Sequence, residues 1–406
     1  MPTPPTPRDV ARRIEGFNVN RDPARVAIKY RRMRADPFAF FRGTAHLFWE
    51  DWSSSKPRVP AAPLVWAAGD AHLENFGSYR GDNRLVYFDI NDFDEAGLAP
   101  ATADIVRLLA SVHVAARTLE LRQSDAAMLC ARMLDAYRTE LAGGKARWVE
   151  RSTSRGMIRD LLVAVRSRRR QQLLASRTTI KRGRRVLKLD GEHLIDIPAD
   201  ERTMMKEGVQ RAGDTLSIHG DSRGFYEVLD LCGRVAGLSS LGLRRYAVLV
   251  RGHGGASGSF ILDVKEIRVS SMVAHLDNPQ PRWQNEADRV VVIQHRMQAI
   301  SPARLAAVSV GRTKFALREL QPTEDRVALR AWNGKVGRLR RVVRTMGRIL
   351  AWAQLRSVAR GGSSHADALI DFGRDKAWVP PALDYAKRYA ATSYDDWREF
   401  VGAASP

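Results

Sequence analysis

An aspartate and an asparagine stand five positions apart in the run GDAHLENF (69–76), and an acidic run, DINDFDEA (89–96), lies beyond the next apolar segment. In phosphoryl-transfer sites, one carboxylate orients the acceptor hydroxyl, while an amide and a second carboxylate hold magnesium under the phosphates of a nucleotide. Magnesium prefers such hard oxygen ligands. The pattern therefore predicts chemistry that uses ATP and Mg²⁺, with Asp70 at the acceptor and Asn75 on the metal.

The acidic run leaves the choice of metal ligand open. The residues that follow Asp92, in DFDEAG (92–97), favour that aspartate, whereas a place at the end of an apolar strand favours Asp89. We expect Asp92 on the metal, with Asp89 or Asp94 as a second ligand. Carboxylates gathered at one site repel unless a cation neutralises them, which favours a metal. The alternative is a turn rich in Asp and Asn that caps neighbouring elements.

Three polar residues near this motif have both a chemical and a structural interpretation. His72 is a candidate catalytic base, or it holds the loop through hydrogen bonds. Arg42 is a candidate phosphate ligand or a partner in a structural ion pair. Asp104 lies in the first turn of an expected helix, where a carboxylate is favoured, and we expect it to brace the loop around Asp70.

A second segment offers a loop for phosphate groups. Gly237 and Gly242, with Ser239 and Ser240 between them, would let backbone N–H groups approach phosphate oxygens. Glycines at this spacing also occur in ordinary hairpin turns, which is the structural alternative.

Lys265 stands near the end of the apolar strand expected at 259–266. A lysine there can reach nucleotide phosphates as a point charge, and the alternative is a solvated lysine on an edge strand. Glu286, at the start of the next helix, is the candidate ion-pair partner, although it fits poorly because the later apolar face of that helix has no acid. Glu266 is expected on the opposite face of the strand, since successive strand side chains alternate.

The chain is strongly basic, with 66 Lys and Arg against 45 Asp and Glu and a formal net charge of +21. Such a charge attracts anionic partners, including nucleotides and nucleic acids. The dense basic segment 166–185 is expected to form an exposed helix and hairpin, either as a solvated face or as a polyanion-binding surface. No zinc-finger or ribonucleoprotein motif accompanies it, so nucleic acid is a minor alternative to a small-molecule or anionic acceptor.

The triplet Asp-Phe-Gly at 371–373 matches a magnesium-binding signature in its letters. No catalytic Asp-x-x-x-x-Asn loop precedes it at a suitable spacing, and it lies between two helical stretches. We expect it to be structural.

Composition indicates a globular protein, with 406 residues, 44% of them hydrophobic and 27% charged. No apolar run reaches the roughly 18 residues of a membrane-spanning helix, and the proline-rich start lacks the apolar core of a signal peptide. The two cysteines, Cys130 and Cys232, suit a reducing compartment. We therefore expect a cytoplasmic protein with no membrane partner, and the oligomeric state stays open.

Hydrophobic periodicity locates the elements that must position these residues. Helices are expected within 24–49 and at 101–119, 124–141, 286–299, 326–356 and 380–400. Strands are expected at 64–68, 85–90, 259–266 and 314–320, and two more on either side of the glycine turn within 234–250.

These residues give the chain a resemblance to a known fold. The loop at 69–75, the run at 92–97 and Asp104 look like the motifs of the aminoglycoside phosphotransferase and choline kinase group within the kinase-like fold. Ala68 stands where that group often has a histidine. Over most of its length the chain also resembles an uncharacterised bacterial family, domain of unknown function 2252. That second resemblance rests on 41–43, 69–77, 88–96, 241–246, 265–266 and 385–386.

The resemblance implies an α+β, bilobal, protein-kinase-like fold, but with its parts in a different order. In that fold the glycine loop and the strand lysine precede the catalytic loop, whereas here Asp70 and Asp92 come before Lys265. We therefore expect a circular permutation, which is tolerated when the termini lie close together at the surface. The expected parts are a disordered or extended tail (1–24), the catalytic-loop and metal-binding part of a helical large lobe (25–225), a small β-rich nucleotide-binding lobe (226–324) and helices completing the large lobe (325–406).

The expected function is an ATP- and Mg²⁺-dependent phosphotransferase whose hydroxyl-bearing acceptor the sequence does not identify. One alternative is a nucleotide-binding pseudokinase or regulator with little turnover, and another is nucleotidyl transfer on the same fold. A polyanion-binding protein that uses the basic segment 166–185 is a third.

Overall fold

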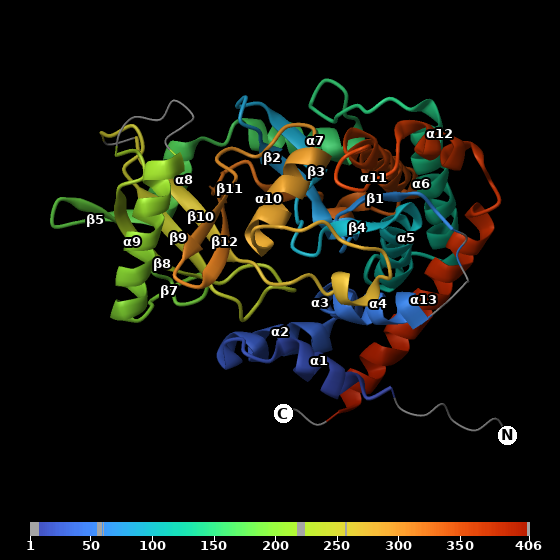
Figure 1. Cartoon of the computed structure of the whole chain (residues 1–406), viewed down its shortest axis with the longest axis horizontal. Coiled ribbons are helices and arrows are strands. Elements are labelled where there is room, and N and C mark those ends of the chain that lie inside the picture. Colours follow the sequence, from blue (N-terminus) through green and yellow to red (C-terminus); the bar gives the residue numbers. More distant parts are fainter. Residues whose placement is uncertain (1–7, 55–58, 60, 217–223, 256–257, 404–406) are drawn as a thin grey trace.

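The computed structural model describes residues 8–54, 59, 61–216, 224–255 and 258–403. The protein is of the α+β class, as predicted, with an antiparallel sheet beside a larger helical part (Figure 1). The six strands of the sheet lie in the order β11-β12-β10-β9-β8-β7. Their bounds are β7 (Leu194–Ile195), β8 (Val228–Arg234), β9 (Arg245–Val250), β10 (Phe260–Glu266), β11 (Ala306–Val310) and β12 (Thr313–Glu319).

Alternation of side chains along β10 gives the sheet two different faces. Leu262 and Val264 enter a hydrophobic core with helix α9 (Ala199–Leu216), which covers one face. On the other face, Ile261 packs in a smaller cluster with helix α8 (Arg170–Arg177) and the hairpin of β5 (Thr178–Lys181) and β6 (Arg184–Leu187). The helix and hairpin predicted for the basic segment are therefore confirmed.

The part built on the sheet begins earlier than the expected boundary at residue 226. Strand β7 pairs with β8, and α9 packs against β8 and β11, although both elements precede that boundary. Helix α10 (Glu286–Met297) follows β10 and packs against β11 and β12.

The helical part is organised around α5 (Ala101–Thr118), whose residues 101–112 are all buried. A helix that is apolar on almost every side must lie inside the protein. The helices that pack around it and around one another are α3 (Pro37–Gly43), α4 (Ala45–Ser54), α6 (Gln123–Gly143), α7 (Gly156–Arg166), α11 (Val336–Arg356), α12 (Ala366–Arg374) and α13 (Val379–Gly402).

Two small antiparallel sheets position the loops of interest. Strand β1 (Leu64–Ala67) pairs with β4 (Gly97–Pro100), and β2 (Phe76–Arg80) pairs with β3 (Val86–Ile90) and β13 (Asp325–Arg326). The loops at 68–75 and 91–96 both connect strands of these sheets, so they are brought to the same place.

The expectation of a disordered or extended tail at 1–24 is wrong where the structure describes it. Residues 1–7 lie outside the described part, but α1 (Val10–Asn18) is a helix, and α2 (Pro23–Ala35) begins inside the expected tail. Val10 and Ile14 are buried on one side of α1, in a cluster that includes Phe400 of α13. This amphipathic face anchors the start of the described chain near its end.

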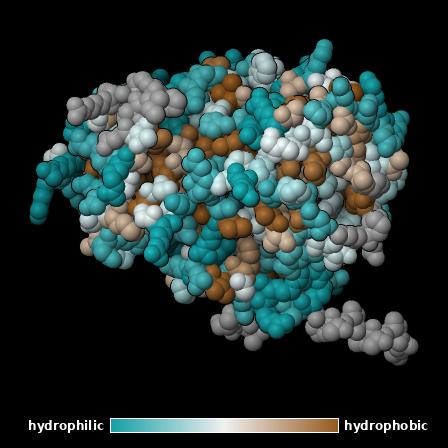
Figure 2. Space-filling model, in the orientation of Figure 1, coloured by the Kyte–Doolittle hydropathy of each residue, from teal (hydrophilic) through white to brown (hydrophobic). Residues whose placement is uncertain are grey.

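The face drawn in Figure 2 is largely hydrophilic, with hydrophobic residues scattered in small groups. Among the helices that the structure describes, none combines the length and apolar character needed to cross a membrane.

Candidate functional site

The loop around Asp70 is held by the first turn of α5. Asp104 accepts hydrogen bonds from the backbone N–H groups of Ala68 (2.7 Å) and Gly69 (3.0 Å), so the predicted bracing role is confirmed. Gly69 has a φ of 80°, and a Cβ there would lie 2.0 Å from the carbonyl oxygen of Glu95. Only glycine fits this position, because the loop passes directly against the acidic run.

The carboxylate of Asp70 forms an ion pair with Arg107, whose side chain is fully buried. The Arg107 Nε donates to Oδ1 at 2.8 Å, while Oδ2 lies 3.8 Å from Nε2 of His72. Burial raises the pKa of Asp70 to about 7, although the guanidinium opposes that rise. Sequence reasoning missed Arg107; its signal was the spacing of three from Asp104, which places both residues on one side of the helix.

His72 is buried and plays a structural part in the loop. Its Nδ1 accepts a hydrogen bond from the backbone N–H of Glu74 at 3.1 Å, at the start of a single 3₁₀ turn. Burial, and then the positive charges of Arg42 and Arg107, hold the pKa of His72 well below its usual range, so the ring is neutral. Arg42 forms an ion pair with Glu74 at 2.5 Å, which matches the structural interpretation of that arginine.

Asn75 connects the two loops. Its side-chain N–H₂ donates to the carbonyl oxygens of Asp70 and Asp92, both at 3.1 Å. Its Oδ1 is buried and accepts no hydrogen bond from any residue that the structure describes. The amide thus keeps one oxygen available beside Asp92.

Lys265 reaches the acidic run from the sheet. Its Nζ lies 3.4 Å from Asp92 and forms a closer ion pair with Asp94. Burial and the neighbouring charge of Asp92 raise the pKa of Asp94 to about 6. Desolvation would also raise the pKa of Asp92, but Lys265 and Arg245 outweigh it and lower that pKa.

These groups border a cavity of about 350 Å³ between the sheet and the two loops. Asn91 also borders it, and the side-chain oxygen of Asn91 is buried without a hydrogen-bond partner in the described chain. The polar residues of the lining include Glu74, Asn75, Asn91, Asp92, Asp94, Arg234, Arg245, Asp263, Lys265, Gln294, Arg318, Glu324, Asp325 and Arg326.

The wall that the sheet contributes to this cavity is charged. Asp263, two residues before Lys265, is buried beside three arginines from other strands of the sheet. Arg234 lies 2.9 Å from its carboxylate, Arg318 lies 3.8 Å away, and Arg245 forms a bidentate pair. These arginines outweigh desolvation and hold the pKa of Asp263 far below its usual range. This cluster was not predicted, although its signal in the sequence is a set of charged residues in otherwise apolar strands.

The structure separates Asp89 from the other two aspartates. Its Oδ2 accepts from the backbone N–H of Ala299 (3.1 Å) and lies 3.2 Å from a guanidinium nitrogen of Arg356, on α11. Asp89 is buried in this ion pair and does not border the cavity within the described chain. The expectation that it shares a metal site with Asp92 is wrong, because the two side chains serve different neighbours.

The glycine loop is only partly at the cavity. Gly237 borders it with a φ of 83°, while Ser239 and Ser240 border an adjoining cavity of about 450 Å³ that shares Asp94. Gly242 packs against α2 and the residues just before it instead, where a Cβ would lie 2.7 Å from Arg21 and 2.9 Å from Val26. The N-terminal part of the chain therefore packs against this loop. Gly242 has a packing role rather than the expected role in binding phosphate.

Glu286 is not the partner of Lys265. It borders the second cavity and forms an ion pair with Arg289 at 2.6 Å. The buried Arg289 in turn donates to the carbonyl oxygens of Ala96 and Asp94, the latter at 2.9 Å. Helix α10 thus supports the acidic run through Arg289. The expected ion pair between Lys265 and Glu286 does not form.

The Asp-Phe-Gly triplet at 371–373 is part of α12, as its structural interpretation required. Asp371 is exposed beside Arg374, and Phe372 stacks on Trp378. A Cβ on Gly373 would lie 2.4 Å from the backbone of α6, so Gly373 allows α12 to pack closely against α6.

The donors at the cavity fit magnesium better than a transition metal. Within the described chain, no three His, Cys, Asp or Glu side chains converge to hold a metal. The available groups are one or two carboxylates and the unpartnered amide oxygens of Asn75 and Asn91. Magnesium is usually held in this sparse way, with phosphates and waters completing its shell.

Comparison with known proteins identifies a family but no activity. No curated protein and no solved structure matches the chain. One family model matches residues 21–403, almost the whole described chain. The chain therefore belongs to the family described as "Uncharacterized protein conserved in bacteria (DUF2252)".

Proposed function

We propose that the protein is an ATP- and Mg²⁺-dependent phosphotransferase with a circularly permuted kinase-like fold, acting on a hydroxyl-bearing acceptor. The observation that carries this proposal is the contact of Lys265 with Asp92 and Asp94. Lys265 lies 173 positions after Asp92, whereas in protein kinases the lysine comes first. All three residues nevertheless border one cavity.

The order of elements around Lys265 supports the same proposal. In protein kinases the phosphate-binding lysine lies on the third strand, after a glycine loop, and a helix follows it. Here β8, a glycine loop, β9 and β10 lead to Lys265, and α10 comes next.

Each group at the site has a role that its geometry permits. Asn75 and Asp92 would hold magnesium, which neutralises charge on the phosphates when bound. Lys265 would bind the nucleotide phosphates once they draw it from its carboxylate partners. Asp70 precedes Asn75 by five residues on the same loop but is not among the described residues that line the cavity. With one oxygen fixed by Arg107, it would accept the proton of the acceptor hydroxyl.

Calorimetric titration of ATP tests the proposal. We expect binding that requires Mg²⁺ and weakens at least tenfold in Asp92→Ala and Lys265→Ala. Asp371→Ala and Lys376→Ala are matched controls, because both residues are exposed and lie outside the cavity lining, Asp371 on α12 and Lys376 in the connection after it, and they should leave the affinity unchanged. No binding to the folded wild type, or binding indifferent to the two site variants, would contradict the proposal.

A nucleotide-binding protein with little turnover is a second candidate, favoured by specific contacts. Glu286 pairs with Arg289 rather than with Lys265, and the cavity wall carries Asp263 with its arginines instead of an apolar surface. ATP binding without transfer across a broad acceptor panel would favour it. Mass spectrometry of any product separates added phosphate from added AMP, and so distinguishes nucleotidyl transfer.

A further inference from the structure

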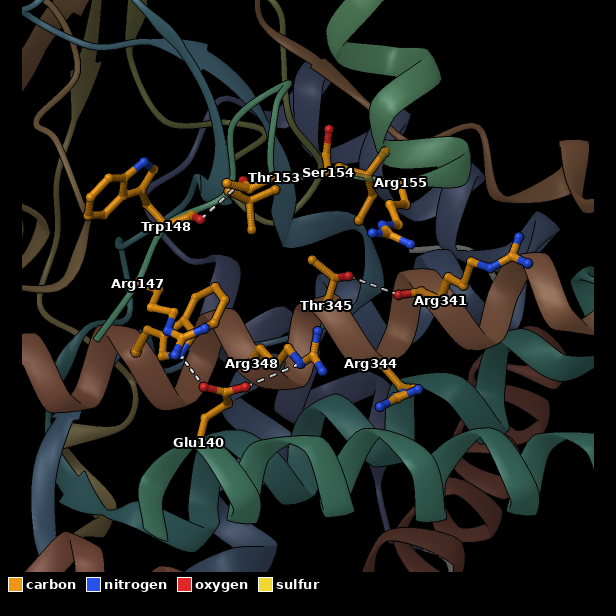
Figure 3. A pocket seen from close by; sticks show the side chains of 13 residues that line it. Glu140, Arg147, Trp148, Thr153, Ser154, Arg155, Arg341, Arg344, Thr345 and Arg348 are labelled. Carbon is orange, nitrogen blue, oxygen red and sulfur yellow. Dashed lines mark hydrogen bonds and ion pairs between the residues drawn. The ribbon is translucent and has the colours of Figure 1, made fainter. Parts of the chain in front are cut away.

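A larger cavity, of about 640 Å³, lies outside the candidate site. It is bounded by α11, α6 and the segment 147–155 that leads into α7 (Figure 3). It shares no lining residue with the cavity around Lys265, as far as the described chain extends. Its volume falls within the roughly 300–1,000 Å³ that small-molecule sites occupy.

The lining is strongly cationic. Five arginines border the cavity against a single acid, Glu140, and the five are Arg147, Arg155, Arg341, Arg344 and Arg348. Glu140 is already engaged, since it lies 3.3 Å from Arg348 and accepts a hydrogen bond from the indole of Trp352 at 2.9 Å. In the described chain, the other four guanidinium groups have no carboxylate within 4.0 Å.

The arrangement follows from helix geometry. Arg341, Arg344 and Arg348 are spaced by three and four residues, so they lie on one side of α11. Figure 3 shows Arg155 and Arg348 extending toward the same space from opposite sides, with Thr345 between them. A cavity lined mainly by one sign of charge raises the local concentration of anions.

The start of α7 adds to the same field. Arg155 precedes its first turn and supplies no side-chain cap, and no acid lies in that turn. Ser154, Arg155 and Ile158 border the cavity, so the positive end of the helix dipole lies at its edge, which also favours an anion.

We propose that this cavity binds a small anion carrying two or more phosphate groups. Arginine forks match phosphate oxygens in geometry and charge. Trp148, 53% exposed at the rim, offers a planar surface to the rest of such a ligand, and Thr345 offers a hydroxyl. The proposal stands independently of the phosphotransferase proposal, since the two cavities use different residues.

Titration of the full chain with inorganic pyrophosphate, in EDTA so that no metal assists the other cavity, tests this proposal. We expect saturable binding that weakens about tenfold or more in the double variant Arg341→Gln/Arg344→Gln, because charged hydrogen bonds are lost. Arg388→Gln/Arg398→Gln is the matched control: it removes the same charge from exposed positions on α13 and should leave the affinity within twofold. Arg344→Lys keeps the charge but removes the guanidinium fork, and it should also weaken binding. This variant tests the proposal if the double variant does not fold.

Three results would overturn the proposal. Equal weakening in the control variant would show that only net charge matters. If Lys265→Ala lost pyrophosphate binding while Arg341→Gln/Arg344→Gln kept it, the anion would lie in the other cavity. Tight binding of a single-stranded oligonucleotide through Arg341 and Arg344, without pyrophosphate binding, would identify a nucleic-acid surface, and its affinity would fall steeply with salt.

Discussion

At the residue scale, the proposed chemistry depends on Asp70 and on the arginine that holds it. Arg107 is fully buried and has the carboxylate of Asp70 as its ionic partner, so the two residues form one unit. Removing Asp70 leaves the guanidinium of Arg107 in a place that water does not reach, and removing Arg107 leaves the carboxylate without its ionic partner. A variant intended to probe catalysis must therefore keep a hydrogen-bond acceptor for Arg107.

Asp70→Asn meets that requirement, because the amide oxygen still accepts from Arg107 while the base is lost. We expect the transfer rate to fall about 10²- to 10⁴-fold with ATP affinity within threefold of wild type. Steady-state rates and calorimetry measure the two quantities. Asp70→Ala serves as the contrast, since it strands a buried guanidinium and should cost about 3–5 kcal/mol of stability. A normal rate in Asp70→Asn would remove Asp70 from the catalytic role.

The pH dependence of the rate tests the same carboxylate. Asp70 must be ionised to act as a base, and its pKa is about 7, so the rate should rise as pH increases toward 7 and level off above it. The folded pKa exceeds the unfolded value, so the folded state binds this proton more tightly, and the stability from Asp70 falls as pH rises from about 4 to 7. A rate that levels off already near pH 5 would mean that Asp70 titrates normally.

At the scale of elements, the first turns of α5 and α10 hold the two loops of the site. Asp104 fixes the start of one loop, while Arg289 fixes the carbonyl groups of the acidic run. Both are buried charged residues that bind backbone groups rather than ligands. This explains how irregular segments keep a defined shape beside a cavity.

Asp104→Ala should therefore loosen the loop around Asp70. Two backbone N–H groups lose a charged acceptor, and we expect a loss of about 2–4 kcal/mol, measured as the free energy of unfolding in urea. Asp104→Asn keeps one acceptor and should lose less. Asp125→Ala is the control, because Asp125 also lies in the first turn of a helix but pairs with Arg122 at the surface. If both alanine variants had the same effect, Asp104 would be an ordinary helix-terminal acid.

At the scale of the whole molecule, the ends of the described chain lie together. Glu399 of α13 accepts hydrogen bonds from the backbone N–H groups of Arg8 (3.2 Å) and Val10 (2.8 Å). Helix α1 also packs against α13 (Figure 1). This closeness is what a circular permutation requires.

The protein should therefore tolerate a change of termini. Joining the ends with a short flexible linker, and opening the chain at the exposed hairpin tip of Arg182 and Gly183, would place the strand of Lys265 ahead of the loop of Asp70. We expect a folded protein with ATP affinity within about threefold of the parent, measured by thermal unfolding and calorimetry. Opening within α5, at the buried Leu108, is the control and should abolish folding. A hairpin permutant that fails to fold would contradict the model of a permuted fold.

Much of the architecture could be predicted from the sequence, because local patterns sufficed for it. The structure confirms the helices around 101–119 and 124–141 and the strands around 85–90 and 314–320, each of which has a strong periodic pattern. The early tail was the main error. There, prolines and charges concealed an amphipathic helix that is stable only because Val10 and Ile14 have a partner surface on α13.

By itself, the sequence determined the two loops, the lysine strand and their unusual order, since residue type and spacing are local properties. Only the tertiary structure decided which of these residues meet. It separates Asp89 from Asp92, pairs Glu286 with Arg289 and pairs Arg107 with Asp70. The physical reason is that a buried charge must find a partner in space, and which partner it finds depends on how distant elements pack.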